Sequence, residues 1–228
     1  MKSAAPGARG SGRPAPARSG AGAGAGTSSA PHEVRIIGGQ WRRSRIPVAD
    51  APGLRPTPDR VRETLFNWLG QDLAGWRCLD AFAGTGALGF EAASRGAARV
   101  LLVERDRRLA EGLRQVKIRL KADAVEVLCA SAQDVMRGLA PDSLDLVFLD
   151  PPYGQGLLRP ALEAAARVVT PGGWVYVEDD QPLADCPAPW VIHRQGRAGM
   201  VHHHLLRRQS AVAAPDNRVD TLSAEASG

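Results

Sequence analysis

The chain has 228 residues, 44% of them hydrophobic, and a formal net charge of +5. This size predicts one sizeable domain with its own core. The sequence contains no apolar stretch near membrane-spanning length and no signal-peptide pattern, so we expect a cytoplasmic protein, most simply a monomer. The three cysteines, Cys78, Cys129 and Cys186, are far apart and lack zinc-binding spacing, which predicts reduced, buried thiols.

The surplus positive charge lies at the N-terminal end. Residues 1–31 contain four basic residues and no acid, and residues 32–64 contain seven arginines against four acids. Residues 1–31 also consist mainly of Gly, Ala, Pro, Ser and Arg, which predicts a disordered tail, and residues 209–228 are expected to form a second one. The pattern favours a polyanionic partner approached by the N-terminal arm. Arginines that serve only solubility are the alternative.

The first ordered elements are expected from residue 33 onward. Residues 33–39 favour a short strand or hairpin, and the basic stretch 41–45 follows it. A helix is predicted over residues 58–69, with Thr57 as N-cap and Pro58 at its first position. Val61, Leu65, Trp68 and Leu69 form its apolar face, and Arg60 and Arg62 lie outside that face. Guanidinium groups pair well with phosphates, so the candidate contacts to a nucleic acid are Arg35, Arg42, Arg43, Arg55, Arg60 and Arg62.

From Trp76 onward the pattern alternates between strand and helix. Strands are predicted near 77–82, 99–104, 124–129, 143–149, 173–178, 189–194 and 200–207. Helices are predicted near 86–95, 106–121, 131–138 and 157–169. The last two strands have only a turn at 194–199 between them, so they should be antiparallel. The expected fold is therefore α/β, a doubly wound parallel sheet that ends in an antiparallel hairpin.

A glycine-rich loop joins the first strand of this sheet to the following helix. Gly84 and Gly86 permit close approach of a ligand to the backbone at a helix N-terminus, and with Gly89 they match the dinucleotide-binding fingerprint. Glu104 ends the next strand, where a carboxylate accepts ribose hydroxyls. This pattern alone fits either a dinucleotide or S-adenosylmethionine. Asp80 favours the latter, since a carboxylate near the loop suits an ammonium group and repels a pyrophosphate.

The sequence Asp150-Pro151-Pro152-Tyr153 follows the apolar run 146–149. The carboxylate should lie at the C-terminal end of a buried strand, where open α/β sheets bind ligands. The two prolines withhold backbone N–H donors, so acceptors remain beside an aromatic ring. That set suits a planar group with an amino substituent, whose hydrogens the acceptors take and whose face Tyr153 covers. A tight Asp-Pro turn is the alternative.

These motifs, in this order, resemble the class I S-adenosylmethionine-dependent methyltransferases that modify exocyclic amines of bases. The stretches 55–69 and 78–89, with 34–39 before them, resemble the RsmD family over roughly residues 33–208. The resemblance implies a seven-stranded Rossmann-like sheet over 71–208 and an RNA-binding extension over 32–70. It also implies methylation of guanine N2 in bacterial 16S ribosomal RNA. This RNA is the expected partner, within the small subunit or its assembly intermediate.

The resemblance also assigns roles to individual residues. It places the cofactor on Asp80, Phe82, Ala83, Gly84, Thr85, Gly86, Glu104, Ala132 and Thr57, and the target base on Asp150, Pro151, Pro152 and Tyr153. Tyr153 stands where the family also uses phenylalanine. Ser131 and Gln133 depart from the family pattern around the adenine.

Other functions remain open at this level. They are a DNA adenine-N6 or cytosine-N4 methyltransferase, a nicotinamide-dependent oxidoreductase and a catalytically silent RNA-binding module. The run His202-His203-His204 could suggest a metal site. Only His202 and His204 share a strand face, however, and no third ligand is evident, so a solvated or packed hairpin is expected instead of a metal site.

Overall fold

A computed structural model describes residues 33–49, 57–183 and 186–210. All of these residues belong to one unit, Pro31–Gly228. The predicted tail at 1–31, Arg55 and the chain beyond residue 210 lie outside the described residues. Within the described ranges, no helix is long and apolar enough to cross a membrane.

Seven strands form one sheet in the order β5-β4-β3-β6-β7-β9-β8. They are β3 (Arg77–Asp80), β4 (Arg99–Glu104), β5 (Val125–Cys129), β6 (Leu144–Leu149), β7 (Val169–Asp179), β8 (Trp190–Ala198) and β9 (Val201–Arg208). The first five are parallel, and β9 runs antiparallel to both β7 and β8. The predicted doubly wound sheet with a terminal antiparallel hairpin is confirmed. Strand order reverses between β3 and β6, so a ligand crevice is expected at their C-terminal ends.

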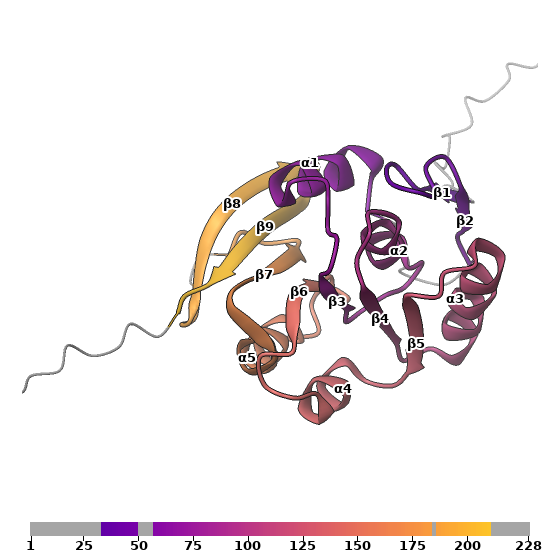
Figure 1. Cartoon of the computed structure of the whole chain (residues 1–228). Helices are drawn as coiled ribbons and strands as arrows, with labels where there is room; N and C mark the ends of the chain where they lie inside the picture. Colours follow the sequence, from indigo (N-terminus) through magenta and orange to yellow (C-terminus); the bar gives the residue numbers. More distant parts are fainter. Residues whose placement is uncertain (1–32, 50–56, 184–185, 211–228) are drawn as a thin grey trace, which may run out of the picture. The chain divides into compact units, whose positions relative to one another are not determined.

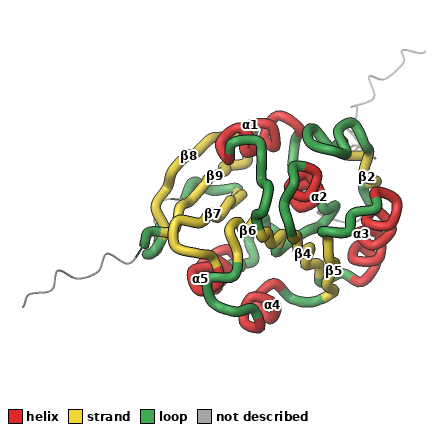
Figure 2. The backbone as a smooth tube through the Cα atoms, viewed as in Figure 1, coloured by secondary structure: helices red, strands yellow, loops and turns green. Residues whose placement is uncertain are grey.

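Helices cover both faces of the sheet (Figures 1 and 2). One face carries α1 (Asp59–Leu69), α2 (Ala87–Ser94) and α3 (Arg107–Leu120), and the other carries α4 (Ala132–Gly138) and α5 (Leu158–Val168). Each face has its own apolar core. Phe66, Phe90 and Phe148 are fully buried in the first, and Met136 and Val147 are fully buried in the second. Alternate residues of each strand feed the two cores, as expected for a sheet covered on both sides.

Some predicted boundaries and burials are wrong. Strand β8 continues to Ala198, because residues 194–198 pair with β9, and the hairpin turn is Gly199-Met200. Gly199 has φ +64°, a left-handed conformation that glycine adopts without strain. The prediction of uniformly buried thiols fails at Cys129. Its side chain is exposed at the end of β5, whereas Cys78 in the central strand β3 is buried.

Helix α1 begins one residue later than predicted. Pro58 is the N-cap residue and offers no side-chain cap, so Thr57 does not cap the helix as expected. The predicted apolar face is present, with Val61, Leu65 and Leu69 buried. Arg62 lies on this buried side as well, contrary to the prediction.

A buried carboxylate of α2 holds the N-terminal extension, and Ser94 of the same helix adds further hydrogen bonds. Strands β1 (Glu33–Arg35) and β2 (Arg45–Pro47) pair antiparallel, and the chain between them lies against α2. The two Glu91 carboxylate oxygens accept hydrogen bonds from Ile37 N (2.8 Å) and Gly38 N (2.7 Å). Glu91 also pairs with Arg62 (3.4 Å) and Arg95 (2.8 Å). Because α2 starts at the glycine loop, this contact ties the extension to that loop's supporting helix.

Candidate active site

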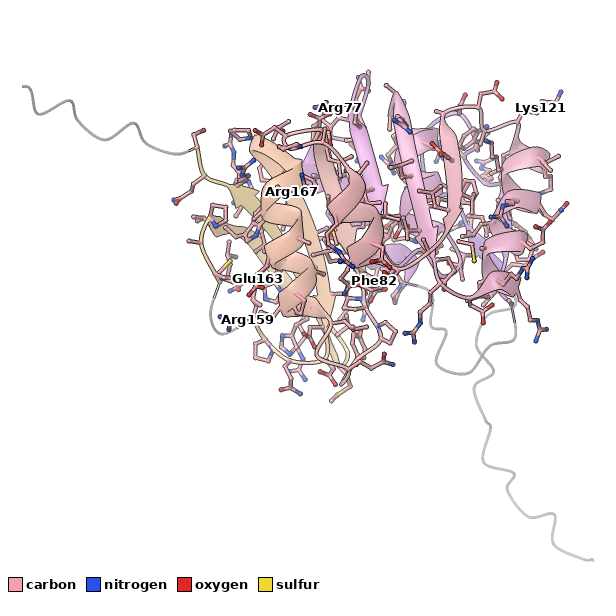
Figure 3. The ribbon with its side chains drawn as sticks, turned by 90° about the horizontal axis from the view of Figure 1, so that it is seen from below. Arg77, Phe82, Lys121, Arg159, Glu163 and Arg167 are labelled. Carbon is pink, nitrogen blue, oxygen red and sulfur yellow. The ribbon has the colours of Figure 1, made fainter. Side chains whose placement is uncertain are left out.

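Acidic side chains gather where four neighbouring parallel strands end. Asp80 ends β3, Glu104 ends β4, Asp150 follows β6, and Glu178 and Asp179 end β7. Figure 3 shows the two ends of the sheet: Arg77 and Lys121 lie at one end, and Phe82 and Arg159 lie toward the other. The catalytic edge, as we name the C-terminal end of β4, β3, β6 and β7, therefore includes the crevice where the strand order reverses.

The glycine loop is held in shape from both sides. Gly84 N donates to Glu104 Oε2 (2.9 Å), and Asp106 N donates to Glu104 Oε1 (2.8 Å). Gly86 has φ +77° and immediately precedes α2. A Cβ there would stand 2.6 Å from Leu113 and 2.8 Å from Phe90, so the loop requires glycine for both conformation and space.

Asp80 lies beneath this loop. It is buried, and its Oδ2 accepts a hydrogen bond from Gly89 N (3.0 Å) in α2. Burial raises the pKa of Asp80 to about 7, with Glu104 and Glu178 adding repulsion and the amides of Gly89 and Phe82 opposing it. A nearby cation would favour the ionised carboxylate.

Asp150 occupies the position predicted for it, directly after β6. Burial raises its pKa well above the ordinary aspartate value, and the carboxylates of Glu178, Asp80 and Asp179 raise it further. Tyr153 is 40% exposed. The partial burial of its phenol raises the pKa of that group, and repulsion from the Asp150 carboxylate raises it further. Pro151 is buried and Pro152 exposed. The ring of Tyr153 is therefore available beside the carboxylate, in the arrangement that the sequence predicts.

The sequence interpretation missed a second acidic layer beside Asp150. Glu178 is buried in β7 and accepts a hydrogen bond from the Tyr176 hydroxyl (2.8 Å). Burial raises its pKa, and hydrogen bonds from Tyr176 and Thr57 oppose the rise. Asp179 follows it. The available signal was the acidic run 178–180 after an apolar strand, the same pattern that identified Asp150.

Thr57 belongs to this site. It is buried, and its side chain hydrogen-bonds to Glu178. The residue predicted as a helix cap thus lies at the catalytic edge, consistent with its other predicted position near the cofactor.

The Ser131–Gln133 segment opens α4, next to the end of β5. Ser131 caps that helix, accepting from Asp134 N (3.1 Å) and donating to Asp134 Oδ2 (2.6 Å). Ala132 is buried in the core. The hydroxyl of Ser131 is therefore already engaged within its own helix.

Comparisons with known proteins place the chain. The family model described as "Conserved hypothetical protein 95" matches residues 34–207. The Escherichia coli K12 protein "Ribosomal RNA small subunit methyltransferase D" is 42% identical over 186 residues, covering 78% of this chain and 91% of that protein. This chain belongs to the RsmD family. The Haemophilus influenzae protein of the same name is 40% identical, covering 78% and 96%. The solved structure of Escherichia coli yhhF matches at 41% identity with a TM-score of 0.70, covering 78% and 99%.

The chain is thus an RsmD-family methyltransferase. Most of the arginines predicted to contact RNA are exposed to solvent. Arg35, Arg42, Arg43 and Arg60 are exposed, and Arg55 lies outside the described residues. Arg35 pairs with Asp59 (3.0 Å) in the first turn of α1.

Arg62 does not contact RNA as the sequence predicts. Its side chain is fully buried and bonds to Glu91, to Asp59 (2.6 Å) and to the Arg35 carbonyl (2.7 Å). It holds β1 and α1 together and is not available to RNA. Its buried partner lies 29 residues away in α2.

The histidine run 202–204 lies in β9 and is largely packed against neighbouring elements. His203 and His204 are buried, and the ring of His203 stacks on Trp68 of α1 with centroids 5.4 Å apart. Over the described ranges, no group of three or more His, Cys, Asp and Glu side chains could hold a metal ion.

Proposed function

We propose that this chain transfers a methyl group from S-adenosylmethionine to the exocyclic N2 of a guanine in 16S ribosomal RNA of the small subunit. The observation that carries the proposal is Asp150-Pro151-Pro152-Tyr153, placed after β6 next to the glycine loop, in a chain of the RsmD family. In this proposal residues 71–208 form the catalytic domain, residues 32–70 form an RNA-binding extension, and residues 1–31 and 209–228 are tails.

The chemistry of the catalytic edge supports the proposed cofactor. Asp80, Asp150 and Glu178 have raised pKa values, so a positive ligand charge among them would be favourable and a dianion unfavourable. S-adenosylmethionine carries a sulfonium and an ammonium, and it supplies an activated methyl group when bound. Asp80 would face its ammonium, Glu104 its ribose hydroxyls and Ala132 its adenine. Phe82–Gly86 and Thr57 would line the rest.

The chain's own part in the reaction is to hold and orient an amine. The N2 lone pair of guanine is delocalised into the ring, so the free amine is a poor nucleophile. Hydrogen bonds from the amine to Asp150 and to the Pro151 carbonyl would favour a pyramidal nitrogen and localise that pair. Tyr153 would stack on the base, which must be splayed out of the RNA to enter. Positioning of this kind supplies up to ~7–11 kcal/mol.

The first prediction tests the cofactor. S-adenosylhomocysteine is expected to raise the melting temperature of the protein, and NAD at the same concentration is expected to leave it unchanged, because a pyrophosphate would lie against Asp80. A thermal shift titration measures both. Affinity for S-adenosylmethionine should also weaken as the pH falls below about 7, since protonated Asp80 no longer attracts the ammonium. Stabilisation by NAD alone would favour the oxidoreductase alternative.

The exposed arginines lie at two places along the proposed RNA surface. Arg60 lies in the first turn of α1, next to Thr57 and the catalytic edge. Arg42 and Arg43 lie on the turn that is docked at Ser94 through Trp41 N (3.0 Å). Ser94 ends α2, about 12 Å from the glycine loop at 1.5 Å per residue. A large RNA could contact both places.

The second prediction tests these two places separately. Arg60→Glu and Arg42→Glu/Arg43→Glu are both expected to weaken RNA binding in a salt-dependent way. The slope of log affinity against log salt should fall by about 0.7 for the single and about 1.4 for the double variant. Filter binding of 16S ribosomal RNA at several salt concentrations measures this. Arg137→Glu, on the opposite face of the sheet, is the matched control. A wild-type slope in either variant would exclude that place as a contact.

A further inference from the structure

The hairpin of β8 and β9 brings its turn to the catalytic edge. Asp179, the last residue of β7, pairs with His202, and His202 pairs on its other side with Arg197. The turn Gly199-Met200 lies just beyond these pairs. Neighbouring strands are spaced about 4.8 Å apart, so Arg197 lies roughly 10 Å from Asp179 and roughly 15 Å from Asp150 across the sheet. The turn therefore flanks the site where the target base is expected.

The turn has an unusual surface for a solvated hairpin. Met200 is 73% exposed, the most exposed of the large hydrophobic side chains on the described surface. Arg197 is also exposed, and its Nε donates to the Gly199 carbonyl (2.9 Å), which holds the guanidinium over the turn. Within the described part of the chain, Arg197 forms no ion pair with a carboxylate. A cation and an apolar side chain are thus presented together.

Charge points to the kind of partner. Residues 194–204, the part of the hairpin next to the turn, contain Arg194, Arg197, three histidines and no acid, whereas Arg208 at the far end pairs with Asp142. Two of these histidines, His203 and His204, are buried, so the exposed charge is that of the two arginines. The neighbouring catalytic edge is acidic, with Asp150, Glu178 and Asp179. A polyanion that places one base near the acids and its backbone along the hairpin would match both surfaces.

The apolar contact has a physical reason in RNA. Extruding one base from a strand leaves the faces of its neighbours unstacked. A methionine side chain can cover such a face, as apolar wedges do in other nucleic-acid complexes. Arg197 can meanwhile pair with an adjacent phosphate.

We propose that the tip of the β8–β9 hairpin is a second RNA-contacting surface, in which Arg197 binds a phosphate and Met200 covers a base next to the extruded one. This inference rests on the proposed function and goes beyond it. The N-terminal extension and the hairpin would then hold the RNA strand from two sides of the catalytic edge.

Two single variants test the two contacts separately. Methyl transfer to small ribosomal subunits that lack the modification is measured at several salt concentrations. Arg197→Glu should raise KM for the subunits and lower the salt slope by about 0.7, with kcat for bound substrate little changed. Met200→Ser should raise KM by about two- to tenfold at every salt concentration, with an unchanged salt slope. Arg137→Glu, which has the same charge change on α4, should behave as wild type.

The outcomes separate this inference from the proposed function. Wild-type KM and salt slope in both hairpin variants overturn the hairpin contact while the methyltransferase proposal stands. A wild-type protein that methylates no ribosomal RNA overturns the proposed function instead. If Met200→Ser raises KM for subunits but leaves the affinity for naked 16S ribosomal RNA unchanged, the turn contacts a ribosomal protein. That result also overturns the RNA contact. Two controls guard against misfolding. Arg197→Gln removes the charge without reversing it and should lower the salt slope too, and every variant should bind S-adenosylhomocysteine as wild type does.

Discussion

Replacing Asp150 with alanine is expected to reduce methyl transfer by about 10²-fold or more, with little loss of affinity for S-adenosylmethionine. The carboxylate is the acceptor at the end of β6 that the amine would need, and removing one group that stabilises a transition state costs about this much. The measurement is single-turnover transfer to small subunits, with cofactor affinity from a separate titration. Asp150→Asn keeps one acceptor oxygen and should fall between alanine and wild type.

The stability of the same variant distinguishes a chemical role from misfolding. Burial and the carboxylates of Glu178, Asp80 and Asp179 raise the pKa of Asp150 in the folded protein. A raised folded pKa means that the ionised group destabilises the fold at neutral pH. Asp150→Ala should therefore be at least as stable as wild type, and its advantage should grow as the pH rises above the ordinary aspartate pKa of about 3.9. Unchanged turnover in a stable Asp150→Ala protein would remove Asp150 from the reaction.

The sequence predicted the catalytic edge well where the signal is local. Asp150 was placed correctly because a short apolar run followed by turn residues fixes where a strand ends, and Glu104 because it ends the next strand about 20 residues after the glycine loop. In parallel strands, the ends that follow such runs meet at one edge. The strand predicted near 173–178 likewise ended at Glu178, but Glu178 and Asp179 were not recognised as site residues because no motif like Asp-Pro-Pro-Tyr follows them.

The residues that the sequence misplaced depend on contacts far away in the chain. Arg62 was predicted to lie outside the apolar face of its helix, although it stands three residues before Leu65 and seven before Leu69, on the same side of the helix. Its burial is possible only because Glu91 in α2 and carbonyls of the extension surround it, and helical periodicity carries no information about them. Thr57 was assigned to a helix cap for a local reason, whereas its partner is Glu178 in β7. Tertiary pairing overrode local preference at both positions.

Glu91→Gln is expected to destabilise the fold strongly, although Glu91 lies away from the catalytic edge. The Glu91 carboxylate is fully buried and neutralises the buried guanidinium groups of Arg62 and Arg95. Removing one partner of a buried ion pair costs about 3–5 kcal/mol, and here Arg62 would keep only its pair with Asp59 while Arg95 would lose its carboxylate partner. In a domain of this size that loss lowers the melting temperature by roughly 6–20 °C. Calorimetry measures it.

The control for this change is Glu111→Gln, on the exposed side of α3. Glu111 pairs with Arg114 (3.4 Å), but Glu111 is exposed and Arg114 is only half-buried, so the cost should stay below about 1 kcal/mol. Arg62→Met combined with Glu91→Gln should cost less than the sum of the single changes, since the buried guanidinium of Arg62, which would otherwise keep only Asp59, is then absent. Equal melting temperatures for Glu91→Gln and Glu111→Gln would contradict the network.

The same variant also reports on how the extension is held. Glu91 accepts the amide hydrogens of Ile37 and Gly38, which anchor the chain between β1 and β2 together with the bonds at Ser94. A glutamine amide can accept at only one of these positions, so amide hydrogen exchange at Ile37 or Gly38 should accelerate more than exchange in the central strand β6. Loosening of this anchor should also raise KM for small subunits with little effect on cofactor affinity, because Arg35 and Arg60 lose their fixed placement relative to the catalytic edge.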